Sequence, residues 1–208
     1  MSIVQRLLAK PWEHAGEMEG IHGGNVVGRP AGRTGLYLFL GVITSLFLLF
    51  SISHQMRASY PDWIAVAEPG ILWFNTGILL LASISLQLAS KAALKTDIGG
   101  ADRAVRNELL AATLFTLLFI AGQAYAWKLM LDAGLYAAGN PANAFFYMFT
   151  AVHAAHLLGG MWFLLKALQT AFTEPDDTAL PNRIGLCATY WHFLLLVWAL
   201  LFYLLLSS

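Results

Sequence analysis

Five long uncharged hydrophobic stretches, separated by short polar segments, dominate the pattern of this chain. They cover 34–56, 69–90, 109–127, 133–165 and 184–208. A hydrocarbon core about 30 Å thick needs about 20 helical residues to cross it. Lipid offers no hydrogen-bond partner to the backbone, and a β-barrel strand would alternate polar and apolar residues. The pattern therefore predicts an all-α polytopic membrane protein with five transmembrane helices.

The expected helices have turn-forming residues between them. We expect helices at about 34–56, 70–90, 109–131, 144–168 and 185–206, after an N-terminal tail that covers 1–33. The connections are short and contain proline, glycine, asparagine or aspartate, so none of them could fold as a soluble domain. Residues 34–208 are thus expected to form a single transmembrane domain.

The distribution of positive charge predicts the orientation of the chain. The 208 residues are 58% hydrophobic and 12% charged with zero net charge, so nucleic acid is not an expected partner. Arg57 and Lys128 lie on one side of the predicted membrane. The other lysines and arginines lie on the opposite side: Arg6, Lys10, Arg29, Arg33, Lys91, Lys95, Arg103, Arg106, Lys166 and Arg183. This bias predicts a cytoplasmic N-terminus and, after five crossings, an external C-terminus.

Two further features limit the possible chemistry. Cys187 is the single cysteine, which excludes a disulfide framework and a thiolate metal site. The first 33 residues have no apolar core ahead of a cleavage site, so we do not expect a signal peptide.

Polar and small residues within two of the stretches predict contacts between helices. Asn75, Ser83 and Gln87 lie in the second stretch, and Gln123 follows Gly122 in the third. Such side chains can bond across helix interfaces in a membrane, at about 0.6–2 kcal/mol for each bond. We therefore expect them to supply interhelical hydrogen bonds.

The fourth stretch contains the candidate functional histidines. His153, His156 and Gly160 are spaced i, i+3 and i+7, which places them on one side of a helix. Ionisable residues at membrane depth suggest a function, and three interpretations are open. Haem or metal ligation needs partners at matching depth, and the expected depths of His54 and His192 in the membrane differ from those of His153 and His156. A proton relay lacks an acidic residue in any stretch. A structural role, with neutral histidines bonded to neighbouring helices or lipid headgroups, is favoured.

In chain order, the motifs resemble those of the cytochrome c oxidase subunit III family, in its short five-helix bacterial form. The segment at 35–41 is similar to the family's Gly-Met-Trp-Leu-Phe-Leu opening, and 75–83 to its Asn-Thr-x-x-Leu-Leu-x-Ser stretch. The segment at 122–127 looks like Gly-Gln-x-x-Glu-Trp, and 190–198 like Tyr-Trp-His-Phe-x-Asp-x-Val-Trp. The most recognisable segment is 145–160, with its two histidines and two glycines.

The chain departs from the family pattern at three positions. Ile43, Ala126 and Leu195 stand where the family usually has acidic residues inside the membrane. Roles that the family gives to those acids, in lipid contact or proton uptake, are therefore in doubt here.

The resemblance implies a non-catalytic subunit of a proton-translocating terminal oxidase in the bacterial cytoplasmic membrane, with its C-terminus in the periplasm. It implies packing on the catalytic subunit I, with subunit II and a small subunit IV as further partners. Haem and copper would belong to the partner subunits. Structural phospholipids would fill a V-shaped cleft between a two-helix bundle (helices one and two) and a three-helix bundle (helices three to five). No catalytic, cofactor-binding or metal-binding residue is expected. The residues expected to contact lipid or another subunit are His153, His156, Gly160, Trp191, His192, Asn75, Ser83, Gln87 and Gln123.

Two alternatives remain open from the sequence. The nearer is the homologous accessory subunit of nitric oxide reductases, which shares the fold and serves another catalytic partner. The more distant is a free-standing haem-binding or transport protein of the membrane.

Overall fold

The computed structural model describes residues 31–65, 69–95, 102–175 and 177–207, and these contain helices and connections but no strand. The helices are α2 (Ala31–Ala58), α3 (Ile71–Lys95), α4 (Arg103–Asp132), α5 (Pro141–Thr173) and α6 (Leu180–Leu206). Each is long and apolar enough to cross a membrane, which confirms the predicted all-α fold with five transmembrane helices. Most of the predicted tail lies outside the described residues, and its last residues, 31–33, begin α2.

Polar residues set the starts of α4 and α5. The carboxylate of Asp102 accepts a hydrogen bond from the backbone N–H of Val105 at 2.9 Å and so caps α4. The side chain of Asn140 accepts from the N–H of Ala142 at 3.1 Å, and Pro141 stands in the first turn of α5. Both helices begin earlier than hydropathy predicts because their first turns contain polar residues.

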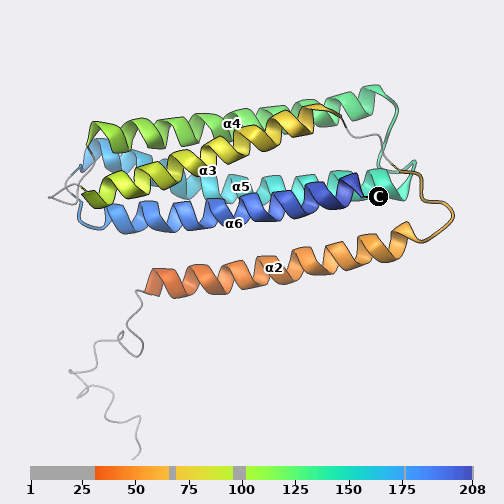
Figure 1. Ribbon diagram of the computed structural model, residues 1–208, viewed down its shortest axis with the longest axis horizontal. Coiled ribbons are helices and arrows are strands. Elements are labelled where there is room, and N and C mark those ends of the chain that lie inside the picture. The colour runs from red at the N-terminus through yellow and green to blue at the C-terminus, as the bar shows by residue number, and fades with distance from the viewer. Residues whose placement is uncertain (1–30, 66–68, 96–101, 176, 208) are drawn as a thin grey trace, which may run out of the picture.

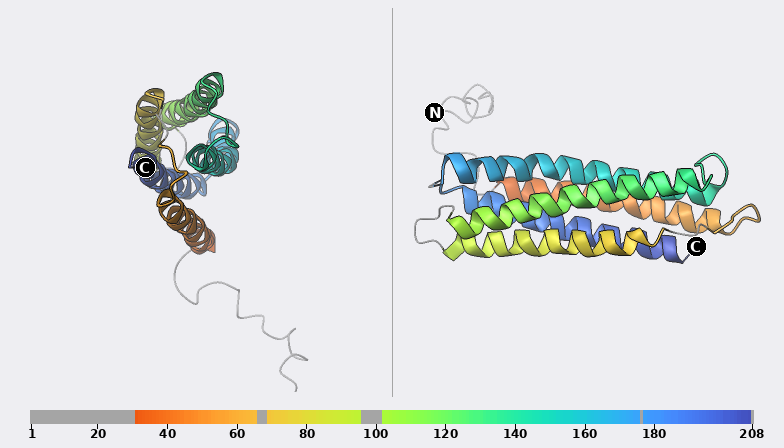
Figure 2. Two further views of the ribbon diagram at one scale, coloured as in Figure 1. Left: turned by 90° about the vertical axis from the view of Figure 1, so that its right-hand side faces the viewer. Right: turned by 90° about the horizontal axis from the view of Figure 1, so that it is seen from above.

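Helices α3, α4, α5 and α6 form a four-helix bundle, and α2 packs against the outside of it (Figure 1). Seen end-on in Figure 2, α2 extends outward from the ring of the other four. Among the described residues, α2 contacts α5 and α6 and makes no contact with α3. The expected pairing of the first two helices as a separate unit is therefore wrong. Helix α3 belongs to the bundle because its face of small residues and leucines packs on α4.

The buried residues of the bundle follow a coiled-coil repeat of about 3.5 residues. Spacings of three and four alternate in α3, at Leu72, Asn75, Leu79, Ala82, Leu86, Ala89 and Ala93. They alternate in α4, at Val105, Leu109, Ala112, Thr116, Phe119, Gln123, Ala126 and Met130. They alternate in α6, at Leu180, Ile184, Cys187, Trp191, Leu194, Trp198, Leu201 and Leu205. In α5 the alternation is interrupted at His153, which lies four residues from both Phe149 and Leu157.

Three tryptophan–threonine hydrogen bonds tie the bundle helices together. The indole N–H groups donate to threonine hydroxyls on neighbouring helices: Trp127 to Thr150 at 2.9 Å, Trp191 to Thr116 at 3.2 Å and Trp198 to Thr76 at 2.9 Å. Each of these hydroxyls also donates to the carbonyl four residues earlier in its own helix. A hydroxyl has one hydrogen and two lone pairs, so it can serve both partners. The bonds link α4 to α5, α6 to α4 and α6 to α3.

Candidate functional site

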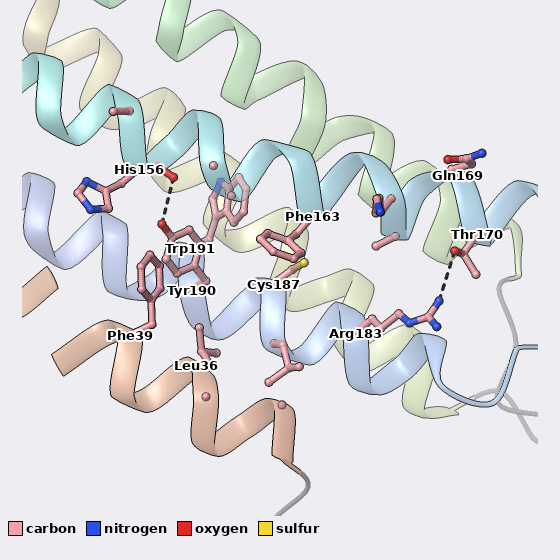
Figure 3. A pocket seen from close by; sticks show the side chains of 18 of the residues that line it. Leu36, Phe39, His156, Phe163, Gln169, Thr170, Arg183, Cys187, Tyr190 and Trp191 are labelled. Atoms are coloured by element: carbon pink, nitrogen blue, oxygen red, sulfur yellow. Dashed lines mark hydrogen bonds between the residues drawn. The ribbon is translucent and has the colours of Figure 1, made fainter. Parts of the chain in front are cut away.

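A cleft of about 1030 Å³ lies between α2 on one side and α5 and α6 on the other (Figure 3). Helix α2 packs on the bundle through the buried residues Leu40, Ile43 and Phe47. The α2 residues that line the cleft all precede Leu40. The cleft is therefore closed where α2 meets the bundle and open toward the start of α2. The cleft separates α2 from α5 and α6, rather than two helices from three as expected.

The walls of the cleft near its closed end are aromatic. The ring of Phe39 on α2 stacks on that of Tyr190 on α6, with their centres 6.2 Å apart (Figure 3). The hydroxyl of Tyr190 donates to the backbone carbonyl of His156 at 3.0 Å, which fixes the tyrosine against α5. Gly160 permits this close approach, because a Cβ there would come within 2.6 Å of the Tyr190 ring and 2.9 Å of Trp191. The result is a smooth apolar wall suited to hydrocarbon chains.

His156 lies at the closed end of the cleft. Its Nδ1 is 2.8 Å from the carbonyl oxygen of Val152, and its ring centre is 5.6 Å from that of Phe47. A carbonyl only accepts hydrogen bonds, so Nδ1 carries the proton and, in the neutral ring, Nε2 is an acceptor. Nε2 has no hydrogen-bond partner among the described residues. The cleft therefore has a polar acceptor at its inner end.

Two cations stand at the open end of the cleft. The guanidinium of Arg183 donates to the hydroxyl of Thr170 at 3.5 Å (Figure 3). It also donates to the carboxylate of Asp177 at 3.0 Å. The ammonium of Lys166 lies 5.3 Å from the centre of the Trp162 ring. Along α5, Thr170 is about 21 Å from His156, at about 1.5 Å for each residue. Half of a bilayer core is about 15 Å thick, so the cleft is long enough for one lipid chain below a polar rim.

His192 belongs to a different place, the outer seam between α3 and α6. Its Nε2 is 2.8 Å from Oε1 of Gln87, and its Nδ1 is 2.5 Å from the hydroxyl of Ser83. The amide oxygen accepts, so Nε2 carries the proton and Nδ1 accepts from the serine hydroxyl. The imidazole is exposed on the outside of the chain and is fully hydrogen-bonded in its neutral form.

His153 lies inside the bundle, away from both the cleft and the seam. It is fully buried, with its ring centre 5.1 Å from that of Trp198 and 5.9 Å from that of Phe119. Asn75 and Gln123 are also buried in the bundle, and their amides have no hydrogen-bond partner among the described residues. No three histidine, cysteine or acidic side chains converge as a metal-binding group in the part of the chain that the structure describes.

The structure thus divides the candidate residues among three places. The cleft contains His156, Gly160 and Trp191, the outer seam contains Ser83, Gln87 and His192, and the bundle core contains Asn75, Gln123 and His153. Reasoning from the sequence missed Lys166 and Arg183 as part of a site. The sequence does indicate their common location. Both cations flank the connection between the fourth and fifth apolar stretches and therefore lie at the same end of the helices.

The three positions that lack the family's acidic residues lie in apolar contacts. Ile43 is buried where α2 meets the bundle, and Ala126 occupies a core position of α4. Leu195 on α6 is partly buried and packs against the core. An ionised carboxylate at the first two positions would be costly without a partner, and the apolar residues avoid this cost.

Comparison with known proteins agrees with the resemblance seen in the motifs. The family model described as cytochrome c oxidase subunit III matches residues 33–207. A cytochrome c oxidase subunit 3 from Synechocystis sp. is 28% identical over 219 residues, covering 96% of this chain and 88% of the relative. A probable cytochrome c oxidase subunit 3 from Mycobacterium tuberculosis is 29% identical over 131 residues, which is 61% of each chain. The corresponding protein from Corynebacterium diphtheriae is 30% identical over 131 residues, covering 61% of this chain and 60% of the relative.

The matches to the Mycobacterium and Corynebacterium proteins therefore span about three fifths of their length. The family match is broader, since it runs through all five described helices. The chain belongs to the cytochrome c oxidase subunit III family.

Proposed function

We propose that this chain is the non-catalytic subunit III of a respiratory haem-copper terminal oxidase of the cytochrome c oxidase type. The observation that carries this proposal is the family match over residues 33–207. Its relatives are cytochrome c oxidase subunits, which favours this role over that of an accessory subunit of a nitric oxide reductase. Haem and copper then belong to the partner subunits of a proton-translocating complex, and this chain binds neither.

In this role the chain packs on the catalytic subunit I, near subunit II and a small subunit IV. The outer seam of Ser83, Gln87 and His192 supports such a contact. A polar group at membrane depth is costly against lipid, so its exposure favours cover by protein. Because both ring nitrogens of His192 are already bonded, a partner helix can cover it without leaving them unpaired.

The second part of the role is binding of phospholipid in the cleft between α2, α5 and α6. The aromatic wall of Phe39 and Tyr190 suits an acyl chain, and Lys166 and Arg183 at the open end suit a phosphate group. The positive charge bias, to which both residues contribute, supports a location of this end at the cytoplasmic face of the bacterial inner membrane. The N-terminus is then cytoplasmic and the C-terminus periplasmic.

Purification of the tagged chain from native membranes in mild detergent tests the proposal. We expect mass spectrometry to find a haem-copper catalytic subunit and phospholipid in the same particle. The visible haem spectrum should stay with the partner when the complex is dissociated. A chain that purifies alone, or one that keeps a haem Soret band after dissociation, would contradict the proposed role.

A further inference from the structure

Among the buried polar residues of the four-helix bundle are two amides and an imidazole, on three different helices. Asn75 on α3, Gln123 on α4 and His153 on α5 are 0%, 2% and 0% exposed. Asn75 and Gln123 occupy core positions of the coiled-coil repeat, and His153 is the residue at which the repeat of α5 is interrupted. They are therefore directed into the bundle rather than toward lipid.

Gln123 lies at the level of His153, as the contacts of the residues one turn away on α4 indicate. Phe119 and Trp127 lie one turn before and one turn after Gln123 on α4. The ring of Phe119 is 5.9 Å from that of His153, and the indole of Trp127 donates to Thr150, one turn from His153 on α5. Since Gln123 lies between these two contacts on α4, it is at the level of Thr150 and His153 on α5.

Asn75 reaches the same layer from α3. A Cβ on Gly122, the residue before Gln123, would collide with the Asn75 side chain, so the asparagine lies directly against this part of α4. The next residue, Thr76, accepts the hydrogen bond of Trp198, whose ring is 5.1 Å from that of His153. The three polar residues therefore share one cross-section of the bundle.

None of these three side chains has a hydrogen-bond partner among the described residues. This applies to the nitrogen and oxygen of both amides and to both ring nitrogens of His153. Each amide can donate two hydrogens and accept at its oxygen, and a neutral imidazole can donate one and accept one. Buried polar groups in native proteins are nearly always paired with protein or with ordered water.

We propose that Asn75, Gln123 and His153 form a water-binding site in which one or more buried water molecules bridge the two amides and the imidazole. Water both donates and accepts, and a buried water typically makes about three hydrogen bonds, which matches this mixed set. The site carries no charge and is enclosed by aromatic rings, which favours a neutral ligand over an ion. A polar layer of this kind also favours one axial register of α3, α4 and α5, because a shifted register would separate the groups.

Near-isosteric apolar substitutions in the complete oxidase complex test the site. Gln123→Met and Asn75→Leu should each lower the melting temperature of the subunit, because each leaves the remaining polar groups without a bridge. The decrease in melting temperature of the double variant should be smaller than the sum of the two single decreases, because the groups act together. Leu86→Met is the matched control, an apolar exchange at another buried position of α3.

If no water bridges these side chains, replacing one buried, unpaired polar group with an apolar one should not destabilise the subunit. An unchanged or raised melting temperature in both single variants therefore overturns the proposal. A high-resolution map of the unaltered complex gives an independent reading that does not depend on variant assembly. Water density between the three side chains is expected, and direct bonds among them without water overturn the proposal.

Discussion

The indole N–H of Trp198 donates to the hydroxyl of Thr76 at 2.9 Å and so joins α6 to α3 inside the bundle. Thr76→Val removes the acceptor at nearly constant volume and leaves a buried indole N–H unpaired. We expect a loss of about 1–3 kcal/mol in the free energy of unfolding, measured by thermal or denaturant unfolding of the purified complex. Thr44→Val is the matched control, because Thr44 is exposed on α2 and its hydroxyl donates to the carbonyl of Leu40 in its own helix. Equal effects of the two variants would show that the Trp198 bond contributes nothing.

Adjacent glycines on α5 give a second prediction. A Cβ on Gly160 would come within 2.6 Å of Tyr190, whereas a Cβ on Gly159 would meet nothing within 4 Å. Gly160→Ala should therefore push α5 and α6 apart and cost about 1–3 kcal/mol. Gly159→Ala should be neutral or slightly stabilising, since alanine favours helix by up to about 1 kcal/mol. Comparison of the two melting temperatures checks this, and a stable Gly160→Ala variant would contradict the close α5–α6 packing.

A third prediction concerns the lipid in the cleft. Gly159 lines the cleft with open space beside it, so Gly159→Phe should fill part of the cleft without disturbing the bundle. Phospholipid bound to the complex, counted by native mass spectrometry or phosphate analysis, should fall. Gly41→Phe is the control, because Gly41 also has open space around it but does not line the cleft. Equal lipid content in both variants would exclude the cleft as the binding place.

His156 gives a prediction that separates a structural role from haem ligation. His156→Leu removes the imidazole acceptor at the closed end of the cleft. We expect weaker assembly or less retained lipid, with a normal haem spectrum in the complex that remains. Visible spectroscopy and gel analysis of the same preparation measure both quantities. Loss of the haem spectrum in a fully assembled complex would mean that His156 has a role in the redox centre.

The number of helices could be predicted from the sequence, but their arrangement could not. Uncharged stretches reveal spans because charge inside lipid is costly. Inside those spans, however, apolar side chains face both the core and the lipid, so hydropathy does not distinguish the two. Leu79 is fully buried, for example, while its neighbours Leu80 and Leu81 are 48% and 46% exposed. The coiled-coil repeat of α3 becomes visible only once burial is known.

The candidate site could likewise be predicted only in part from the sequence. The histidine motif of α5 could be recognised from its spacing, and the family followed from the order of the motifs. Residues three apart on a helix differ in direction by about 60°, and here that difference separates the bundle core from the cleft. His153 is fully buried, and His156 borders the cleft. The sequence does not show which of the two histidines borders the cleft, because this depends on the position of α2 beside α5.

The attachment of α2 has a consequence for how the chain comes apart. Among the α2 residues whose burial is described, the buried ones begin at Leu40: Leu40, Ile43, Phe47 and His54. The repeating core of α3, α4, α5 and α6 includes none of them, so detachment of α2 leaves that core complete. We therefore expect the chain to unfold as two units of unequal stability, α2 and the four-helix bundle. Rising denaturant should detach α2 in an early transition and unfold the four-helix bundle in a later one.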